Sequence, residues 1–305
     1  MDNVTTTPDP NWPTAAALLV SEPDTARCNV GLLGVFTYAS SVSARSWHNT
    51  PAAVRGALEY YSTWSYDDES DLADSVRLVD YGDVFDPDGS GGAERVATAV
   101  AKFDESLALR LVLGGDNSAT WYAMAAVAGD QLSNYGLITL DAHHDLRDGQ
   151  SNGSPVRQLL EAGLDGRSVV QIGLADFSNS AFYASRARDA GITVIARDVL
   201  RRESVELVAR RALDIAGAGG RPIYVDIDLD AADRSVAPGC PAAAPGGLSA
   251  DELRRFARIV AADPRVRALD ITEIDVGRDS TDQRTVRLAA LLVLEVLAGV
   301  RRRTQ

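Results

Sequence analysis

Apolar runs of four to seven residues alternate with longer stretches of helical periodicity along most of the chain. The runs are rich in β-branched and aliphatic side chains, which is typical of buried strands, whereas the longer stretches have the period of amphipathic helices. We predict strands at Asn29–Val35, Ser75–Asp80, Leu109–Leu113, Gly136–Leu140, Ser168–Ile172, Thr193–Ala196, Pro222–Ile227 and Arg267–Ile271. We predict helices at Pro51–Tyr61, Ala93–Ser106, Ala119–Ala128, Pro155–Glu161, Ser180–Ala190, Ser204–Ala216, Ala250–Ala262 and Asp282–Val300.

This alternation is typical of parallel strands joined by crossover helices. Eight strands could close into a barrel, but polar motifs follow only some of them, which favours an open sheet with a site outside the carboxyl ends of those strands. We therefore predict an α/β fold with three layers: an open, mainly parallel eight-stranded sheet with helices on both faces. No long linker divides the chain, so we expect a single domain over residues 1–305.

The segment through Asp24 contains four prolines and little apolar periodicity. We interpret residues 1–25 as an N-terminal extension that wraps the surface or is mobile.

Four polar segments each follow a predicted strand: GGDNSAT (Gly114–Thr120), DAHHDLRD (Asp141–Asp148), DIDLD (Asp226–Asp230) and DITEID (Asp270–Asp275). A carboxylate costs several kcal/mol to remove from water unless something compensates its charge. Helix caps and turn aspartates could explain any one of these segments, but the four together indicate a metal site.

In an extended segment alternate side chains point the same way, so Asp141, His143 and Asp145 can converge on one point. The same holds for Asp228 and Asp230. These five mixed carboxylate and imidazole ligands are too many for a closed zinc site, and they suit two ions bridged by carboxylates, with Mn²⁺ the natural candidate. Two such ions can bind a bridging water and lower its pKa, which is hydrolytic chemistry.

Charge and composition exclude several other classes of protein. With 43 acidic and 30 basic side chains the net charge is −13, so the chain should repel the phosphates of nucleic acids. The longest helix-like apolar stretch, Ala289–Val300, is interrupted by Glu295 and is shorter than the ~20 residues of a membrane span. The polar, acidic N-terminus does not resemble a secretion signal, and the two cysteines, Cys28 and Cys240, form no disulfide framework, so we expect a cytoplasmic protein.

The four polar segments resemble, in order and spacing, the signatures of the arginase/agmatinase (ureohydrolase) family over Gly31 to Val300. The third segment extends without a gap to Leu248 and resembles the serine-x-Asp-x-Asp block of that family, with Ala237-Pro238-Gly239 as an anchor. This register makes Asp228 and Asp230 the ligands, and it places Asp226 at the usual serine position. Without the anchor we would choose Asp226 and Asp228.

The resemblance implies an arginase-like fold and a role for each metal ligand. Asp141 and Asp228 would bridge both ions, Asp145 would complete one site, and His143 with Asp230 would complete the other. Two Mn²⁺ ions per chain are expected, and the resemblance suggests trimers or hexamers.

Two residues differ from the usual pattern of the family, and they help to identify the subfamily. Asn117 occupies the position of a histidine ligand, and because an amide oxygen is a weaker donor than imidazole, one metal should bind loosely. Asn152 occupies the position at which arginases have a histidine, so a proton-shuttling role of that histidine is absent.

The segments DAHHDLRD, SNGSPVR and QIGLADFSNSAFY most resemble the formimidoylglutamases of histidine breakdown. The resemblance implies hydrolysis of N-formimidoyl-L-glutamate to L-glutamate and formamide. Two alternatives are an agmatinase-like guanidino hydrolase that releases urea and a catalytically silent family member.

The family pattern also assigns catalytic and substrate-binding candidates. Glu273 matches a glutamate that would clamp the amidinium group, and Asp145 would relay a proton to the departing amine. Guanidinium groups match the two substrate carboxylates, so Arg147 and Arg157 are candidates alongside surface ion pairing. Other candidates for substrate contact are Asn152, Asn179 and Ser180, the last two against a plain helix N-cap, and His48 is a weaker one.

Overall fold

The computed structural model describes residues 9–44, 46 and 49–304. Its large sheet contains β1 (Leu19–Val20), β2 (Cys28–Val35), β5 (Val76–Val84), β6 (Leu109–Gly114), β7 (Gly136–Leu140), β8 (Val169–Leu174), β9 (Thr193–Ala196), β10 (Ile223–Asp228) and β11 (Val266–Thr272). Every pair of neighbouring strands in this sheet is parallel. A small antiparallel hairpin, β3 (Trp64–Ser65) and β4 (Ser70–Asp71), lies outside it.

The helices within the described residues are α1 (Thr50–Ala57), α2 (Gly92–Val100), α3 (Ser118–Ala128), α4 (Pro155–Glu161), α5 (Ala181–Asp189), α6 (Arg197–Leu200), α7 (Val205–Ala216), α8 (Ala250–Ala262) and α9 (Arg284–Arg301). Local capping signals define several of their starts. Helix α8, for example, begins with a capping box in which Ser249 and Glu252 satisfy each other's backbone N–H groups. In the described part of the chain no helix is long and apolar enough to span a membrane.

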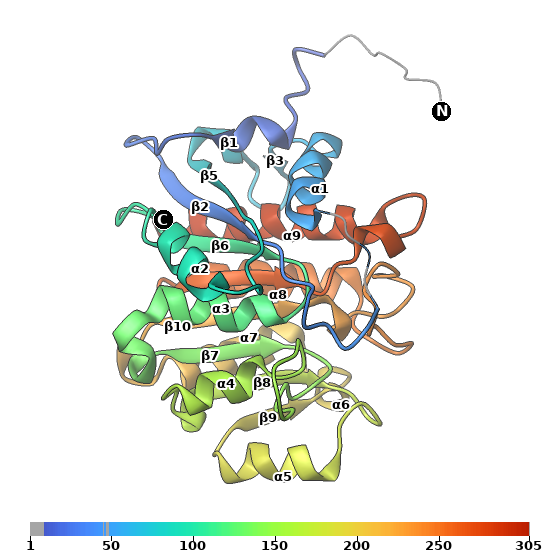
Figure 1. Ribbon diagram of the computed structural model, residues 1–305. Helices are drawn as coiled ribbons and strands as arrows, with labels where there is room; N and C mark the ends of the chain where they lie inside the picture. The colour runs from blue at the N-terminus through green and yellow to red at the C-terminus, as the bar shows by residue number, and fades with distance from the viewer. Residues whose placement is uncertain (1–8, 45, 47–48, 305) are drawn as a thin grey trace.

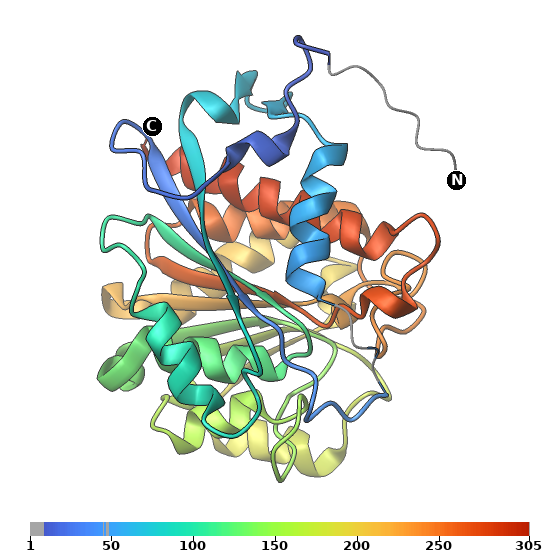
Figure 2. The same cartoon turned by 45° about the horizontal axis from the view of Figure 1, so that its top comes forward.

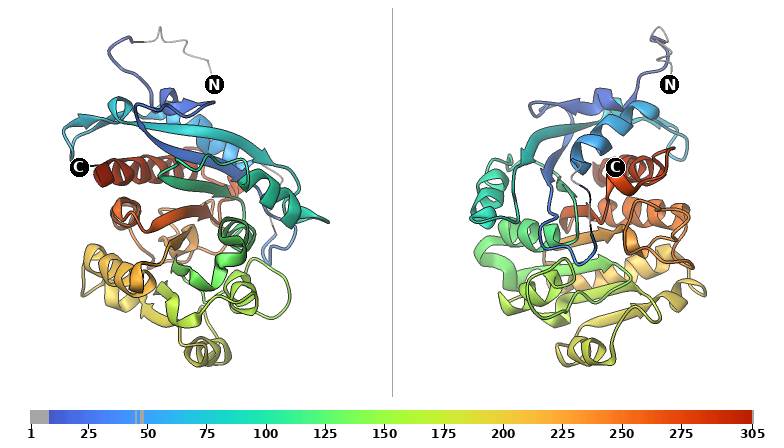
Figure 3. Two further views of the ribbon diagram at one scale, coloured as in Figure 1. Left: turned by 90° about the vertical axis from the view of Figure 1, so that its left-hand side faces the viewer. Right: turned by 45° about the vertical axis from the view of Figure 1, so that its right-hand side comes forward.

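Apolar side chains form one cluster on each face of the sheet. One cluster contains Val54 of α1 together with buried residues of α7, α8 and α9, and the other contains Val96 of α2 together with buried residues of α3 and α4. Figure 3 shows these helices on opposite sides of the sheet, and Figure 1 labels them. Because both faces are covered, the strands read as nearly continuous apolar runs. The predicted three-layer α/β fold is confirmed.

The sheet has nine strands rather than the eight predicted, because the N-terminal segment contributes β1. Leu19 and Val20 pair with Leu78 and Val79 of β5 at the sheet edge, and the preceding Leu18 is fully buried. Figure 2 shows this segment lying against the rest of the molecule. Residues 9–24 are therefore packed into the fold in part, and a two-residue strand is too short to produce a periodic signal.

The strand order β1-β5-β2-β6-β11-β10-β7-β8-β9 explains where the polar segments meet. The four segments follow β6, β7, β10 and β11, and these strands are consecutive neighbours in the middle of the sheet. Because the strands are parallel, their carboxyl ends all lie at the same edge. Segments up to about 160 residues apart in the chain are thereby brought together.

Candidate metal centre and active site

Two overlapping groups of potential metal ligands lie at this edge. Asp141, His143 and Asp230 form one group, and Asp141, Asp145 and Asp228 form the other, each with its ligand atoms within 4.8 Å of one another. Asp141 belongs to both groups. Asp228 and Asp230 are included and Asp226 is not, which is the register that the family resemblance favoured.

The segment after β7 reaches this geometry without being extended. It leaves the strand at Leu140 and follows an irregular path in which Asp145 has a φ of 51°. The expectation that simple alternation orients Asp141, His143 and Asp145 was therefore wrong in its reasoning, although the three side chains do converge. A left-handed backbone at a non-glycine residue is rare and is typical of functional sites.

The aspartates of the centre are buried and tightly bonded to the surrounding backbone. Asp141, Asp145, Asp228 and Asp230 are each 6% exposed or less. The backbone N–H of Asp230 donates to Asp228 Oδ1 at 2.7 Å, and Asp230 Oδ1 accepts from the N–H of Ala142 at 2.9 Å. These bonds fix the carboxylates but do not neutralise them.

Burial and mutual repulsion of the carboxylates raise the pKa values of three of these aspartates. Burial, followed by the charge of Asp230, raises the pKa of Asp141 to about 7. Burial and the neighbouring carboxylates likewise raise the pKa values of Asp145 and Asp228 well above their usual range. Within the described part of the chain, His143 is the single cationic side chain that pairs with these four aspartates.

The imidazole of His143 pairs with the carboxylate of Asp230. Its Nδ1 lies 2.6 Å from Asp230 Oδ2. Burial by itself would lower the pKa of His143, but the charges of Asp230 and Asp141 outweigh it and raise that pKa to about 12. The imidazolium in turn outweighs the effect of burial on Asp230 and lowers the pKa of that carboxyl. A divalent ion would replace this proton.

The donor set fits divalent metal ions. Asp141 Oδ2 is buried and has no hydrogen-bond partner among the described residues, although a buried carboxylate oxygen normally has one. Carboxylates with one imidazole are ligands that Mn²⁺ accepts. Positive charge at this position would compensate the burial of the four aspartates, so we interpret the two groups as a metal centre.

Glu273 lies beside the metal centre with an unusual backbone. It follows β11, is 2% exposed and has a φ of 62°. Its Oε1 accepts two hydrogen bonds, from the backbone N–H of Asn117 at 3.0 Å and from Nδ2 of Asn152 at 2.8 Å. The carboxylate is thereby held in one orientation at the cavity wall.

The amide of Asn117 presents its nitrogen, not its oxygen, to the metal centre. Nδ2 donates to Asp145 Oδ2 at 2.5 Å, while Oδ1 accepts from the hydroxyls of Thr120 and Thr272 at 2.8 and 2.9 Å. Ligation through the oxygen, as the sequence analysis expected, requires the amide to turn over. The two hydroxyls permit this because a hydroxyl can accept as well as donate.

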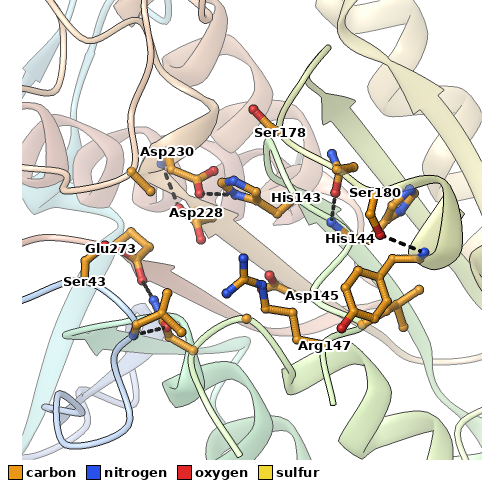
Figure 4. Close-up of a pocket in the computed structure, with 17 residues that line it drawn as sticks. Ser43, His143, His144, Asp145, Arg147, Ser178, Ser180, Asp228, Asp230 and Glu273 are labelled. Carbon is orange, nitrogen blue, oxygen red and sulfur yellow. Dashed lines mark hydrogen bonds and ion pairs between the residues drawn. The ribbon is translucent and has the colours of Figure 1, made fainter. Parts of the chain in front are cut away.

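A cleft that is partly open to solvent adjoins both ligand groups. Of the predicted residues, His143, Asp145, Arg147, Asn152, Asn179, Ser180, Asp228, Asp230 and Glu273 line it. Figure 4 shows Asp228, Asp230 and His143 on one side and the guanidinium of Arg147 turned toward the middle. The side chain of Arg147 makes no hydrogen bond or ion pair with the described residues. A Cβ at Gly153 would lie 2.7 Å from Arg147 Cδ, so glycine allows the arginine to cross this loop.

Arg157 does not line the cleft, which corrects its assignment as a substrate ligand. Its Nε donates to the carbonyl of Arg147 at 2.6 Å, its guanidinium also bonds the carbonyl of Gly149, and it pairs with Glu161 at 2.5 Å. These contacts hold the loop between β7 and α4. The one-turn spacing of Arg157 and Glu161 on a helix is the signal that favours this structural role.

Asn179 and Ser180 line the cleft, but their side chains bond mainly to the backbone. Asn179 accepts from the N–H of His144 at 3.0 Å and donates to the carbonyl of Ala142 at 2.9 Å. Ser180 caps α5 by accepting from the N–H of Tyr183 at 3.2 Å. The two residues shape the wall of the cleft and hold the ligand-bearing segment.

Some residues near the centre are not metal ligands, and some residues that line the cleft were not predicted from the sequence. His144 lies outside both ligand groups, and its Nδ1 is 2.7 Å from Gln171 Oε1. Cys240 is fully buried and does not line the cleft. Tyr183, Val42 and Ser43 line the cleft without having been singled out. Tyr183 lies three residues after the Ser180 cap, a weak signal, whereas nothing local indicates Val42 or Ser43. His48 lies outside the described residues.

The sequence model that describes the arginase family matches residues 28–299 of the chain. The formimidoylglutamase of Halalkalibacterium halodurans is 36% identical over 88% of this chain and 86% of its own length. The crystal structure of formimidoylglutamase from Bacillus subtilis superposes with a TM-score of 0.88 at 28% identity, covering 98% of this chain and 96% of that one.

A third similar protein is formiminoglutamase of Trypanosoma cruzi, whose structure with Mn²⁺ has a TM-score of 0.85. It is 23% identical, with 96% of this chain and 99% of that one covered, and shows likeness of fold. The family match extends over all four polar segments, and two of them, after β7 and β10, supply the carboxylates and the histidine of the metal centre. The chain therefore belongs to the arginase family of metal-dependent hydrolases.

Proposed function

We propose that this protein is a formimidoylglutamase, which hydrolyses N-formimidoyl-L-glutamate to L-glutamate and formamide in histidine breakdown. One observation supports this choice most strongly. A buried carboxylate, Glu273, and the guanidinium of Arg147, which pairs with none of the described residues, line the same cleft beside the metal-ligand groups. The substrate has an amidinium at one end and carboxylates at the other, so its charges are complementary to the cleft.

The two ligand groups would hold two Mn²⁺ ions through Asp141, His143, Asp145, Asp228 and Asp230. Such ions, when bound, lower the pKa of water and so supply a nucleophile near neutral pH. The remaining steps depend on the side chains of this chain.

Glu273 would bind the amidinium and orient its carbon. A carboxylate that faces a planar cation makes charge-assisted hydrogen bonds, and the two donors on Oε1 hold Glu273 ready for that contact. Arg147 would bind a substrate carboxylate in the fork of its guanidinium. These two contacts fix the substrate from both ends.

Asp145 would transfer the proton. Water adds to the formimidoyl carbon, and the bond from that carbon to the glutamate nitrogen breaks. Asp145 accepts the proton released by the water and delivers it to the departing amine.

Product analysis tests the proposal directly. Purified protein, loaded with Mn²⁺, is incubated with N-formimidoyl-L-glutamate, agmatine and guanidinobutyrate in parallel. We expect formamide and L-glutamate from the first substrate. Release of urea from a guanidine without formamide release would instead identify a guanidino hydrolase. No turnover of any amidine, with less than about one ion bound per chain, would identify a catalytically silent member.

We also propose that the 305 residues form a single cytoplasmic domain that assembles into trimers or hexamers. Light scattering coupled to size exclusion measures the assembly.

A further inference from the structure

Asn152 is the one predicted substrate ligand in the cleft whose side chain touches Glu273. It lies in the loop before α4 and is 8% exposed. Its Oδ1 accepts from the backbone N–H of Val42 at 2.9 Å, and its Nδ2 donates to Glu273 Oε1 at 2.8 Å. Both ends of the amide are therefore engaged by protein groups.

The chemistry of the two partners fixes the orientation of this amide. A backbone N–H can only donate, and an ionised carboxylate can only accept, so the oxygen must face Val42 and the nitrogen must face Glu273. Asn117 differs on its oxygen side, where the partners are hydroxyl groups that can donate or accept.

Asn152 also joins two parts of the cleft wall. The segment that contains Val42 is held upstream by hydrogen bonds from the N–H groups of Tyr38 and Ala39 to Asp88, at 2.7 and 2.6 Å. Downstream, the N–H of Ser46 donates to Asp275 at 2.9 Å. Between these anchors, Val42 and Ser43 reach the cleft, and Figure 4 shows Ser43 on the same side as Glu273.

We propose that Asn152 is a positioning residue that fixes the Glu273 carboxylate and the Val42–Ser43 wall relative to each other, rather than a ligand of the substrate. The proposal rests on the proposed role of Glu273 as the amidinium-binding group. In this role the neutral amide of Asn152 orients the carboxylate of Glu273, and it does not compete with Glu273 for the amidinium of the substrate. A side chain whose polar atoms are already bonded gains little by turning to the substrate carboxylates.

Two variants separate the two hydrogen bonds. Asn152→Asp keeps an acceptor for the N–H of Val42 but removes the donor to Glu273. Asn152→Leu removes both bonds and adds no charge. We expect each variant to lower kcat/KM about 10- to 100-fold, the usual effect of losing a bond to a charged group that orients a site. Only Asn152→Leu should speed hydrogen exchange at the backbone amide of Val42.

Inhibition by L-glutamate distinguishes positioning from substrate binding, because L-glutamate has the carboxylates of the substrate and lacks its amidinium. We expect its inhibition constant to stay within about twofold in Asn152→Leu, and to rise at least about tenfold in the control Arg147→Ala. A parallel loss of L-glutamate binding and kcat/KM in Asn152→Leu would identify Asn152 as a carboxylate ligand and overturn the proposal.

Wild-type kcat/KM in Asn152→Asp would also overturn it, and this variant gives an answer even where Asn152→Leu does not fold. A failure of the proposed function looks different, since the wild-type protein would then release no formamide. In that case the same variants are tested with the amidine that is hydrolysed and with its amine product as the inhibitor.

Discussion

The amide nitrogen of Asn117 donates a hydrogen bond of 2.5 Å to Oδ2 of Asp145, a ligand of the proposed metal centre. Asn117 thus contacts the centre from the position at which the sequence resemblance leads us to expect a histidine ligand. As oriented, it offers a donor to a carboxylate and no ligand to a metal. The affinity for metal should therefore respond strongly to the side chain at this position.

Replacing Asn117 with histidine should tighten Mn²⁺ binding about tenfold or more, because imidazole is a better donor to Mn²⁺ than an amide oxygen is. Activity at limiting metal should rise in parallel. Calorimetric titration of metal-free protein measures the affinity. Asn117→Ala, which adds no ligand, is the control and should not bind more tightly. Equal affinities of the wild-type protein and Asn117→His would mean that residue 117 does not contact the metal.

Asp228→Ala should abolish the binding of both ions, since Asp228 is expected to bridge them. Asp226→Asn provides a matched control. Asp226 lies two residues earlier on β10, is equally buried and belongs to neither ligand group. We expect this control to retain bound metal. Metal analysis of both variants after incubation with manganese tests the register, and an active Asp228→Ala variant would refute it.

Arg147→Ala should raise the KM for N-formimidoyl-L-glutamate about 10- to 100-fold, because the proposed charge-assisted, bidentate contact with a substrate carboxylate would be lost. An amidine without carboxylates should show no such change. Arg157→Ala is the control, since Arg157 bonds the loop and not the cleft. Its thermal stability should fall while its KM stays close to that of the wild-type protein. Steady-state kinetics that show the reverse pattern would restore Arg157 as a substrate ligand.

The metal-free protein should lose stability as the pH rises from about 5 to 7.5. The folded state raises the pKa of Asp141 from 3.8 to about 7, and it raises the pKa values of Asp145 and Asp228 in the same direction. The folded state therefore binds more protons than the unfolded state in this interval, so the free energy of unfolding falls as these protons leave. The favourable contribution of His143 is complete below about pH 6.5 and does not reverse this trend.

We expect the Tm of the metal-free protein to fall by at least about 5 °C across this interval. Thermal unfolding in the presence of a chelator measures the change. Added Mn²⁺ should raise the Tm more at pH 7.5 than at pH 5, because it replaces protons at the same carboxylates. Asp141→Asn should flatten the pH dependence. A metal-free protein that is more stable at pH 7.5 would show that the cluster is compensated by some other charge.

The sequence by itself determined the layers of the fold and the chemistry of the centre. Apolar runs such as Gly136–Leu140 are long enough to identify buried strands. Several carboxylates placed directly after such strands would cost much desolvation free energy unless a cation compensates their charge. Both signals are local, so they can be read without knowing what lies nearby.

Tertiary structure decided which of these residues meet and how each one points. The order of β6, β11, β10 and β7 unites the four segments, and the left-handed backbone of Asp145 and Glu273 aims their carboxylates. From the sequence, Arg147 and Arg157 are equally good candidates for binding the substrate carboxylates. In the structure Arg147 lines the cleft, whereas Arg157 bonds the backbone of the loop between β7 and α4. Such outcomes depend on contacts between segments far apart in the chain, and the energies of those contacts leave no local pattern in the sequence.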